Sequence, residues 1–239
     1  MLVSTKAIVL SKIRYKDSDL IVKCYTQHFG VKSYLLKNIL KSKKGKLKMA
    51  YFQPLTLLDI EATHNTNRTL HYIKEVKLYN HYISIHTNIL KSSISLFIAE
   101  VLSNLLKEEE EDLQLYNFIE SALIWFDINE TDTNFHLLFL LEFTKYLGCY
   151  PNVVKPDALF FNLDNGSFGN QREGTYCISE ENLTYFKQLL GMKFDASKRF
   201  EIRSAAKREL LNAILLYYKL HIEGFNEPKS VAVLNQTFN

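Results

Sequence analysis

The sequence contains little cysteine, and its first residues lack the features of an export signal. Its 239 residues include three cysteines, Cys24, Cys149 and Cys177, which lie far apart in the chain. This spacing excludes the disulfide framework of a small secreted protein. The N-terminus also lacks the apolar core and the small-residue cleavage site of a signal peptide. We therefore expect a reducing, cytoplasmic setting.

Long apolar runs are missing as well. The longest apolar stretches cover residues 94–106, which Glu100 and Asn104 interrupt, and residues 135–143. Both are shorter than the roughly 20 residues that a helix needs to cross a bilayer. We interpret them as core helices and expect no membrane partner.

Motifs for metal binding and catalysis are also absent. Cys149 and Cys177 have no cysteine two or three positions away, and no HExxH sequence occurs. The glycines Gly166, Gly169 and Gly174 match neither a dinucleotide fingerprint nor a phosphate-binding loop, and the chain has no G-x-S-x-G sequence. We therefore predict a protein that is not an enzyme and has no catalytic residue, metal or cofactor.

Acidic residues are scarce at the beginning of the chain. Residues 1–50 contain 12 Lys and Arg but two Asp and Glu, a balance of +10. Residues 51–145 have a balance of −8 and residues 146–239 one of +1, so the net charge of +3 hides the asymmetry. A localised basic field attracts polyanions, and nucleic acid is the first candidate.

The first eighty residues have the short β-branched and aromatic runs of strands, separated by turn residues. We predict five strands, at residues 3–13, 20–26, 31–38, 52–62 and 70–79. The connections are too short for helical crossovers, so we expect antiparallel pairing. A five-stranded barrel of this size is typical of the OB-fold, which commonly binds oligonucleotides, although an SH3-like barrel fits nearly as well.

From about Ser84 the apolar period changes to between three and four residues, which indicates helices. One apolar stripe covers residues 89–105, and further helices are predicted at residues 113–126, 134–147, 179–190, 199–222 and 231–238. Asn165-Gly166 between aromatic residues predicts a β-hairpin. The expected fold is α+β, with an OB-fold DNA-binding domain at 1–80 and a helical domain at 81–239 that contains a hairpin insertion at about 158–179.

A lysine-rich loop is the main candidate for a binding site. Residues 37–48 contain six lysines and no acidic residue, and Arg14 and Lys16 come from a neighbouring loop. Lysines follow phosphates, while aromatic faces stack on bases. The predicted DNA-binding residues are Arg14, Lys16, Lys37, Lys41, Lys43, Lys44, Lys46 and Lys48. A loop that serves only solubility is the alternative. The interleaved aromatics Tyr15, Tyr25, Tyr34, Tyr51 and Phe52 are either base-stacking or core residues.

Several segments resemble the RecO family of recombination proteins in their order and spacing. In the predicted barrel they are Ala7-Ile-Val-Leu10, residues 15–22, Tyr25-Thr26, Gly30, the loop 37–48 and Gln53-Pro54-Leu55. In the predicted helical domain they are residues 147–152, residues 205–208, Tyr217-Tyr218, residues 221–225 and Lys229-Ser230. The resemblance covers nearly the whole chain.

The resemblance implies a mediator of recombinational repair in the RecF pathway. Such proteins bind single- and double-stranded DNA, anneal complementary strands, join RecR, and help to load RecA onto strands coated by single-strand-binding protein (SSB). It also implies a cytoplasmic, nucleoid-associated location. Many members have paired cysteines in a zinc-binding insertion, which this chain lacks, so we expect no bound zinc.

Family members also grip the acidic C-terminal tail of SSB through the helical domain, which implies cations beside an apolar pocket. On a helix from about residue 199, a three- and four-residue spacing places Arg203 and Lys207 at the start of an apolar stripe. Arg208 lies off the stripe but within a family-like segment. We predict that Arg203, Lys207 and Arg208 bind the tail. Alternatively, the stripe is ordinary core and its cations pair with carboxylates such as Glu201 or Asp195.

Two other functions fit the same composition. An RNA-binding OB-fold protein needs the same basic barrel, and so does a protein adaptor with an acidic partner. Without the resemblance, the sequence separates these two functions poorly from DNA binding.

Overall fold

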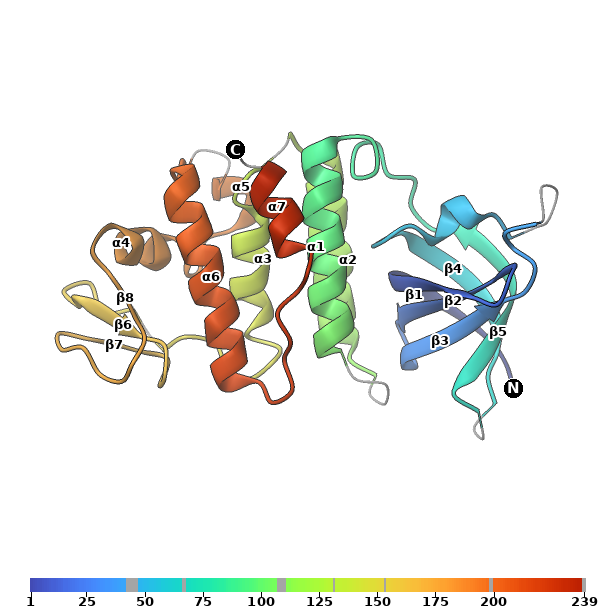
Figure 1. Cartoon of the computed structure of the whole chain (residues 1–239), viewed down its shortest axis with the longest axis horizontal. Helices are drawn as coiled ribbons and strands as arrows, with labels where there is room; N and C mark the ends of the chain where they lie inside the picture. The colour runs from blue at the N-terminus through green and yellow to red at the C-terminus, as the bar shows by residue number, and fades with distance from the viewer. Residues whose placement is uncertain are drawn as a thin grey trace. The chain divides into compact units, whose positions relative to one another are not determined.

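The computed structural model describes residues 1–41, 47–65, 68–106, 111–130, 132–152, 154–197 and 200–237. The chain folds into two compact units, Met1–Ile128 and Asn129–Asn239. The first unit contains a β-barrel and two helices, and the second contains the other helices and a small sheet (Figure 1). No helix in these ranges is both long and apolar enough to span a membrane.

Five strands close into a barrel in the order β1-β2-β3-β5-β4. They are β1 (Leu2–Tyr15), β2 (Asp19–Thr26), β3 (Gly30–Leu36), β4 (Leu57–Thr63) and β5 (Leu70–Leu78). Alternate residues of a strand face opposite sides of a sheet, so every second apolar residue enters the barrel core. Val22, Cys24 and Tyr34 are fully buried there. The predicted five-stranded barrel followed by a helical region is therefore confirmed.

The expectation that all five strands pair antiparallel was wrong for one pair. β3 and β5 run parallel, with Ser33 opposite Leu70 and Tyr34 opposite His71. Strand directions cannot alternate all the way round a closed ring of five strands, because five is an odd number. Closure of the barrel therefore requires a parallel pair.

The fourth strand begins later than predicted. Residues Met49–Phe52 form a short 3-10 helix, and β4 starts at Leu57 rather than at residue 52. Pro54 has no N–H to donate to a strand ladder, and Leu55 has a φ of 61°, outside the extended region. Leu55 N–H donates instead to Val9 O at 2.7 Å, which closes the segment onto β1.

Two helices complete the first unit, α1 (Ile89–Leu105) and α2 (Leu113–Ile128). Asn88 caps α1, because its side chain accepts the Lys91 N–H. The buried Lys91 ammonium donates to Phe126 O at 2.7 Å and to Asp127 O at 3.0 Å, which joins the beginning of α1 to the end of α2. The Asp127 carboxylate accepts backbone N–H groups of the linker that follows the barrel, including that of Ile83 at 2.8 Å.

The second unit consists of a three-stranded sheet and five helices in the described ranges (Figure 1). The helices are α3 (Phe135–Phe143), α4 (Glu180–Leu189), α5 (Phe194–Ser197), α6 (Ser204–His221) and α7 (Val231–Thr237). The strands β6 (Phe160–Asn162), β7 (Ser167–Gly169) and β8 (Cys177–Ser179) are ordered β7-β6-β8. The predicted hairpin is β6-β7, and its turn residue Gly166 has a φ of +66°. β8 and α5 were not predicted.

Two helix boundaries differ from the sequence-based ones by about four residues or more. α3 ends at Phe143 rather than at residue 147, and α6 begins at Ser204 rather than at residue 199. Residue 199 and the predicted end of the last helix at residue 238 lie outside the described residues. The later start of α6 changes the position of Arg203, which lies before the helix as its N-cap.

Candidate nucleic-acid interface

Hydrogen bonds bring two basic loops of the barrel together. Ser18 Oγ, in the β1–β2 turn, donates to Asn38 Oδ1 at 3.0 Å, and Asn38 N–H donates to Asp19 Oδ1 at 2.7 Å. Leu40 N–H donates to Ser18 O at 3.1 Å. The β1–β2 turn is therefore fixed against the segment that follows β3. We call the four exposed cations of these two loops the basic end of the barrel; they are Arg14, Lys16, Lys37 and Lys41.

The charges of the four cations of the basic end are not neutralised by an ion pair with a described carboxylate. Arg14 Nη2 donates to the backbone oxygen of Asp17 at 3.0 Å, which leaves the other guanidinium donors for a ligand. Lys37 Nζ lies 5.3 Å from the centroid of the Tyr72 ring. Because Asp19 accepts a backbone N–H, its carboxylate is used to hold the loops.

The rest of the predicted DNA-binding loop is only partly described. Lys48 is exposed before the 3-10 helix, with Nζ 5.9 Å from the centroid of the Tyr51 ring. Lys43, Lys44 and Lys46 lie outside the described residues.

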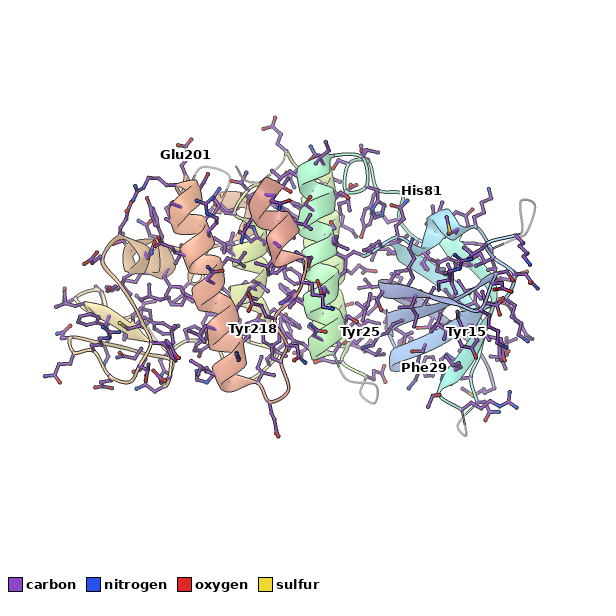
Figure 2. The ribbon with its side chains drawn as sticks, viewed as in Figure 1. Tyr15, Tyr25, Phe29, His81, Glu201 and Tyr218 are labelled. Atoms are coloured by element: carbon purple, nitrogen blue, oxygen red, sulfur yellow. The ribbon has the colours of Figure 1, made fainter. Side chains whose placement is uncertain are left out.

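The barrel separates the interleaved aromatic residues into two groups. Tyr25, Tyr34 and Phe52 are buried, so they are core residues and do not present a ring to a base. Tyr15 is 37% exposed at the end of β1, where Lys16 Nζ lies 5.4 Å from the ring centroid (Figure 2). Tyr51 is partly buried against the barrel core, so Tyr15 is the most exposed residue of this set.

Two further barrel cations hold the helices of the first unit. Lys6 Nζ lies 3.4 Å from Glu120 Oε1 and 3.6 Å from the centroid of the Tyr79 ring. Lys23 Nζ donates to Ser103 O, at the end of α1, at 2.7 Å. Lys6 and Lys23 therefore stabilise the packing of the barrel against the helices. The charge balance of +10 counted from the sequence is larger than the charge that is available to a ligand.

The barrel also has a pocket at its mouth that the sequence did not indicate. It has a volume of about 630 Å³ and is lined by Met1, Phe29, Lys32, Thr63, His64, Asn65, Arg68 and His71. His64 and His71 come from the end of β4 and the start of β5, so strand register brings them together. No sequence motif marks such a pair.

The predicted tail-binding cations of the second unit have local partners. Arg203 forms an ion pair with Glu181 of α4, through Nη2 to Oε2, with Nε to Oε1 at 3.2 Å. The hydrogen bond that Arg203 donates to Glu181 raises the pKa of Arg203. The sequence-based alternative named Glu201 or Asp195 as partners, but the partner is Glu181, which is distant in sequence.

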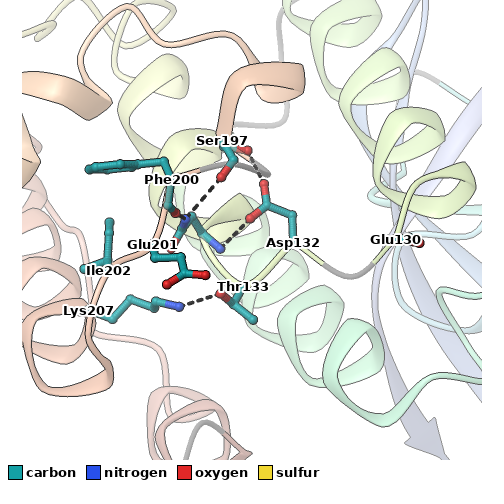
Figure 3. Close-up of a pocket in the computed structure, with 9 residues that line it drawn as sticks. Glu130, Asp132, Thr133, Ser197, Phe200, Glu201, Ile202 and Lys207 are labelled. Atoms are coloured by element: carbon teal, nitrogen blue, oxygen red, sulfur yellow. Dashed lines mark hydrogen bonds between the residues drawn. The ribbon is translucent and has the colours of Figure 1, made fainter.

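Lys207 is buried and lines a polar pocket of about 370 Å³ (Figure 3). Its ammonium donates to Thr133 Oγ1. Burial lowers the pKa of Lys207, and the carboxylates of Asp132 and Glu201 oppose this shift. Arg208 is half-buried. Arg203 and Lys207 therefore have different partners.

The apolar stripe of α6 packs inside the second unit. Leu210, Ile214 and Tyr217 are buried, and the Tyr217 hydroxyl donates to Cys149 O at 2.8 Å. His221 Nε2 lies 2.7 Å from Leu163 O. This part of the stripe is core, as the sequence-based alternative held.

Within the described ranges, no group of three or more His, Cys, Asp or Glu side chains is placed to hold a metal ion. Cys149 and Cys177 are half-buried free thiols. The residues described in this region do not fit a zinc site.

Comparisons with known proteins match both parts of the chain. Residues 1–82 match the family described as Recombination protein O N terminal, and residues 86–230 match the family described as Recombination protein O C terminal. Proteins named DNA repair protein RecO are similar over the full length of both chains. That of Christiangramia forsetii is 42% identical over 238 residues, and that of Bacteroides fragilis (strain YCH46) is 33% identical over 243 residues.

Proposed function

The chain belongs to the RecO family of DNA repair proteins, and on that premise we propose that it is a recombination mediator that binds DNA through the basic end of its barrel. The observation that carries this proposal is the pair of hydrogen-bonded loops. They bring together the segments that carry Arg14, Lys16, Lys37 and Lys41, which have no carboxylate partner among the described residues. Lys43, Lys44, Lys46 and Lys48 extend the same loop in sequence and belong to the proposed interface.

The proposed mechanism is electrostatic. Each Lys or Arg that contacts a phosphate releases counterions, so binding is strong at low salt and insensitive to sequence. A basic surface that holds two strands reduces the repulsion between their backbones, while base pairing supplies the specificity. Annealing of complementary strands follows without covalent chemistry. Help in loading RecA onto SSB-coated strands belongs to the same proposal.

We extend the proposal to protein partners. These are RecR and the acidic C-terminal tail of SSB, in a cytoplasmic, nucleoid-associated setting. Arg203, Lys207 and Arg208 are the proposed tail-binding residues. Since Arg203 already pairs with Glu181, an acidic tail has to compete with that carboxylate.

The tail site is tested with a peptide of the acidic tail and the variants Arg203→Ala, Lys207→Ala and Arg208→Ala. Calorimetry should show weaker binding to each variant than to the wild type. Lys219→Ala, at an exposed position on α6, is the matched control and should bind as the wild type does. Three variants that bind the peptide normally would move the site elsewhere.

The central experiment compares single-stranded DNA, duplex DNA and RNA at several salt concentrations, together with a strand-annealing assay. We expect both DNA forms to bind with affinity that falls steeply with salt, and we expect annealing to be accelerated. A clear preference for RNA would favour the RNA-binding alternative. Binding of an acidic protein without binding of DNA would favour an adaptor.

A further inference from the structure

The pocket at the barrel mouth has aromatic rings and imidazoles on its walls. The centroid of the Phe29 ring lies 4.9 Å from that of His64, and the His64 and His71 rings are 4.6 Å apart. Phe29 packs against the barrel core, and His71 is buried. The rings are therefore held in place by strands and a tight turn, and the half-buried rings of Phe29 and His64 give the pocket flat surfaces (Phe29 is labelled in Figure 2).

The charged groups that line this pocket are all positive. They are the Met1 ammonium, Lys32 and Arg68, and the described lining contains no Asp or Glu. The Met1 ammonium donates to His64 O at 2.7 Å, which places it at the pocket wall. An anionic group is therefore favoured at this site.

Hydrogen bonds fix the positions of both imidazoles. Tyr34 OH lies 2.9 Å from His64 Nε2, and Asn65 N–H donates to His71 Nδ1 at 3.4 Å. Burial lowers the pKa of His64 to about 4, and His71, Lys32 and the N-terminal ammonium add to the shift. Near neutral pH, His64 is therefore an uncharged polar ring.

We propose that the barrel mouth binds one nucleotide of a single DNA strand, with its base against Phe29 and His64 and its phosphate beside Lys32 and Arg68. Aromatic faces stack on any base, and cations track the backbone, which is the chemistry of single-strand recognition. The volume of about 630 Å³ lies in the usual range for small-ligand sites, which often occupy barrel mouths.

Strand β5 connects the pocket at the barrel mouth to the basic end. His71 lines the pocket, and its neighbour Tyr72 lies under Lys37, 5.3 Å from Nζ. Tyr72 is also opposite Thr63, another lining residue, in the β4–β5 register. Neighbouring residues of β5 therefore link the mouth to the basic end. This inference rests on the proposed DNA-binding function and deepens it.

The site predicts a preference for unpaired DNA. In a duplex each base is stacked and paired, and it enters a protein pocket only after both interactions are broken. Duplex binding by the basic end needs no such step. The pocket should therefore add affinity for single strands and none for intact duplex.

Binding of a single-stranded oligonucleotide and of its duplex to Phe29 variants tests the stacking role. Phe29→Leu keeps apolar volume but removes the ring, and Phe29→Tyr keeps the ring. We expect Phe29→Leu to weaken single-strand binding about fivefold or more, the loss of one base stack, with duplex affinity unchanged. Phe29→Tyr should bind as the wild type does. Equal losses for both DNA forms, or for both variants, would overturn the proposal.

Arg68→Gln tests the phosphate contact, with Lys77→Gln, an exposed cation of β5 outside the pocket, as its matched control. The expected result is weaker single-strand binding for Arg68→Gln alone. Identical behaviour of the two variants contradicts the assignment.

A nucleotide titration tests the pocket without an oligonucleotide. The chain has seven histidines, and deoxyadenosine monophosphate should shift the NMR signals of His64 and His71 while the other five stay unchanged. Inorganic phosphate should shift them less, because it has no base. Unmoved His64 and His71 signals, or equal shifts with an acidic peptide, would refute the proposal. If the wild type binds neither DNA form, the proposed function fails, and this titration still decides the pocket.

Discussion

The basic end of the barrel and the beginning of α6 both contain clustered cations, but their surroundings differ. At the basic end, the described residues give the cations no carboxylate partner. Near α6, Arg203 pairs with Glu181, and Lys207 is buried beside Asp132 and Glu201. The local balance of charge explains the difference, because residues 1–50 have two acids and residues 146–239 have ten. An anion that binds near α6 therefore has to compete with local carboxylates, and one that binds the basic end meets no such ion pair among the described residues.

The largest expected effect is a loss of DNA binding after reversal of the basic end. The combined change Arg14→Glu, Lys16→Glu, Lys37→Glu and Lys41→Glu should weaken DNA binding on the order of 100-fold at low salt, because four phosphate contacts become repulsive. Electrophoretic mobility shift or fluorescence anisotropy measures this, with circular dichroism as the check on folding. Arg203→Gln with Arg208→Gln is the comparison. If that pair loses as much affinity, the distinction between the two clusters fails.

The free energy of unfolding should depend more on a cation near α6 than on a cation of the basic end. Lys207→Ala should lower the free energy of unfolding by about 1–3 kcal/mol, because it removes a buried hydrogen-bond donor beside two carboxylates. Lys37→Ala should change it by less than about 0.5 kcal/mol, since the side chain is exposed. Urea denaturation measures both values. Equal destabilisation by the two variants would contradict the structural use of Lys207.

The buried residue His136 predicts that the stability of the fold depends on pH. Burial, with a further contribution from Lys207, lowers the pKa of His136 to about 3. The unfolded state, with an ordinary histidine pKa near 6.5, then binds the proton more readily than the folded state. Stability should therefore fall as pH decreases from about 6.5 toward 3, by at most ~1.4 kcal/mol per pH unit from this group. Urea midpoints at pH 7 and pH 5 measure the slope, which His136→Gln should reduce. An unchanged slope in that variant argues against the assignment.

The smallest effect is expected for the exposed ion pair. Arg203 and Glu181 are both solvent-accessible, so attraction between their charges is screened and offset by the ordering of long side chains. Arg203→Gln should leave the urea midpoint unchanged within measurement error. A shift as large as that of Lys207→Ala would show that the pair is structurally important.

The sequence predicted the elements with strong local patterns. Alternating residues specified the barrel strands, and Asn165-Gly166 specified the β6-β7 hairpin. Features that depend on distant contacts, and elements too short to show a pattern, were not predicted. The parallel β3–β5 pair follows from barrel closure, β8 is only three residues long, and α5 is a single turn.

The candidate sites were likewise predictable only where their residues are close together in the sequence. The lysine-rich loop was recognisable because its residues are consecutive. That residues 37–41 of this loop lie against the β1–β2 turn depends on the bonds of Asn38 to Ser18 and Asp19. The pairing of Arg203 with Glu181 and of His64 with His71 also depends on tertiary structure. Local sequence does not contain that information.

The most direct test of the DNA-binding account is the salt dependence of single-strand affinity for two variants. In one, Arg14, Lys16, Lys37 and Lys41 are changed to Gln, and in the other, Arg203 and Arg208 are changed to Gln. For a single strand, each phosphate-binding cation that is removed should make the slope of log K against log salt shallower by roughly 0.7, so by about three in the first variant. In the second variant the slope should equal that of the wild type. An unchanged slope in the first variant would contradict the account.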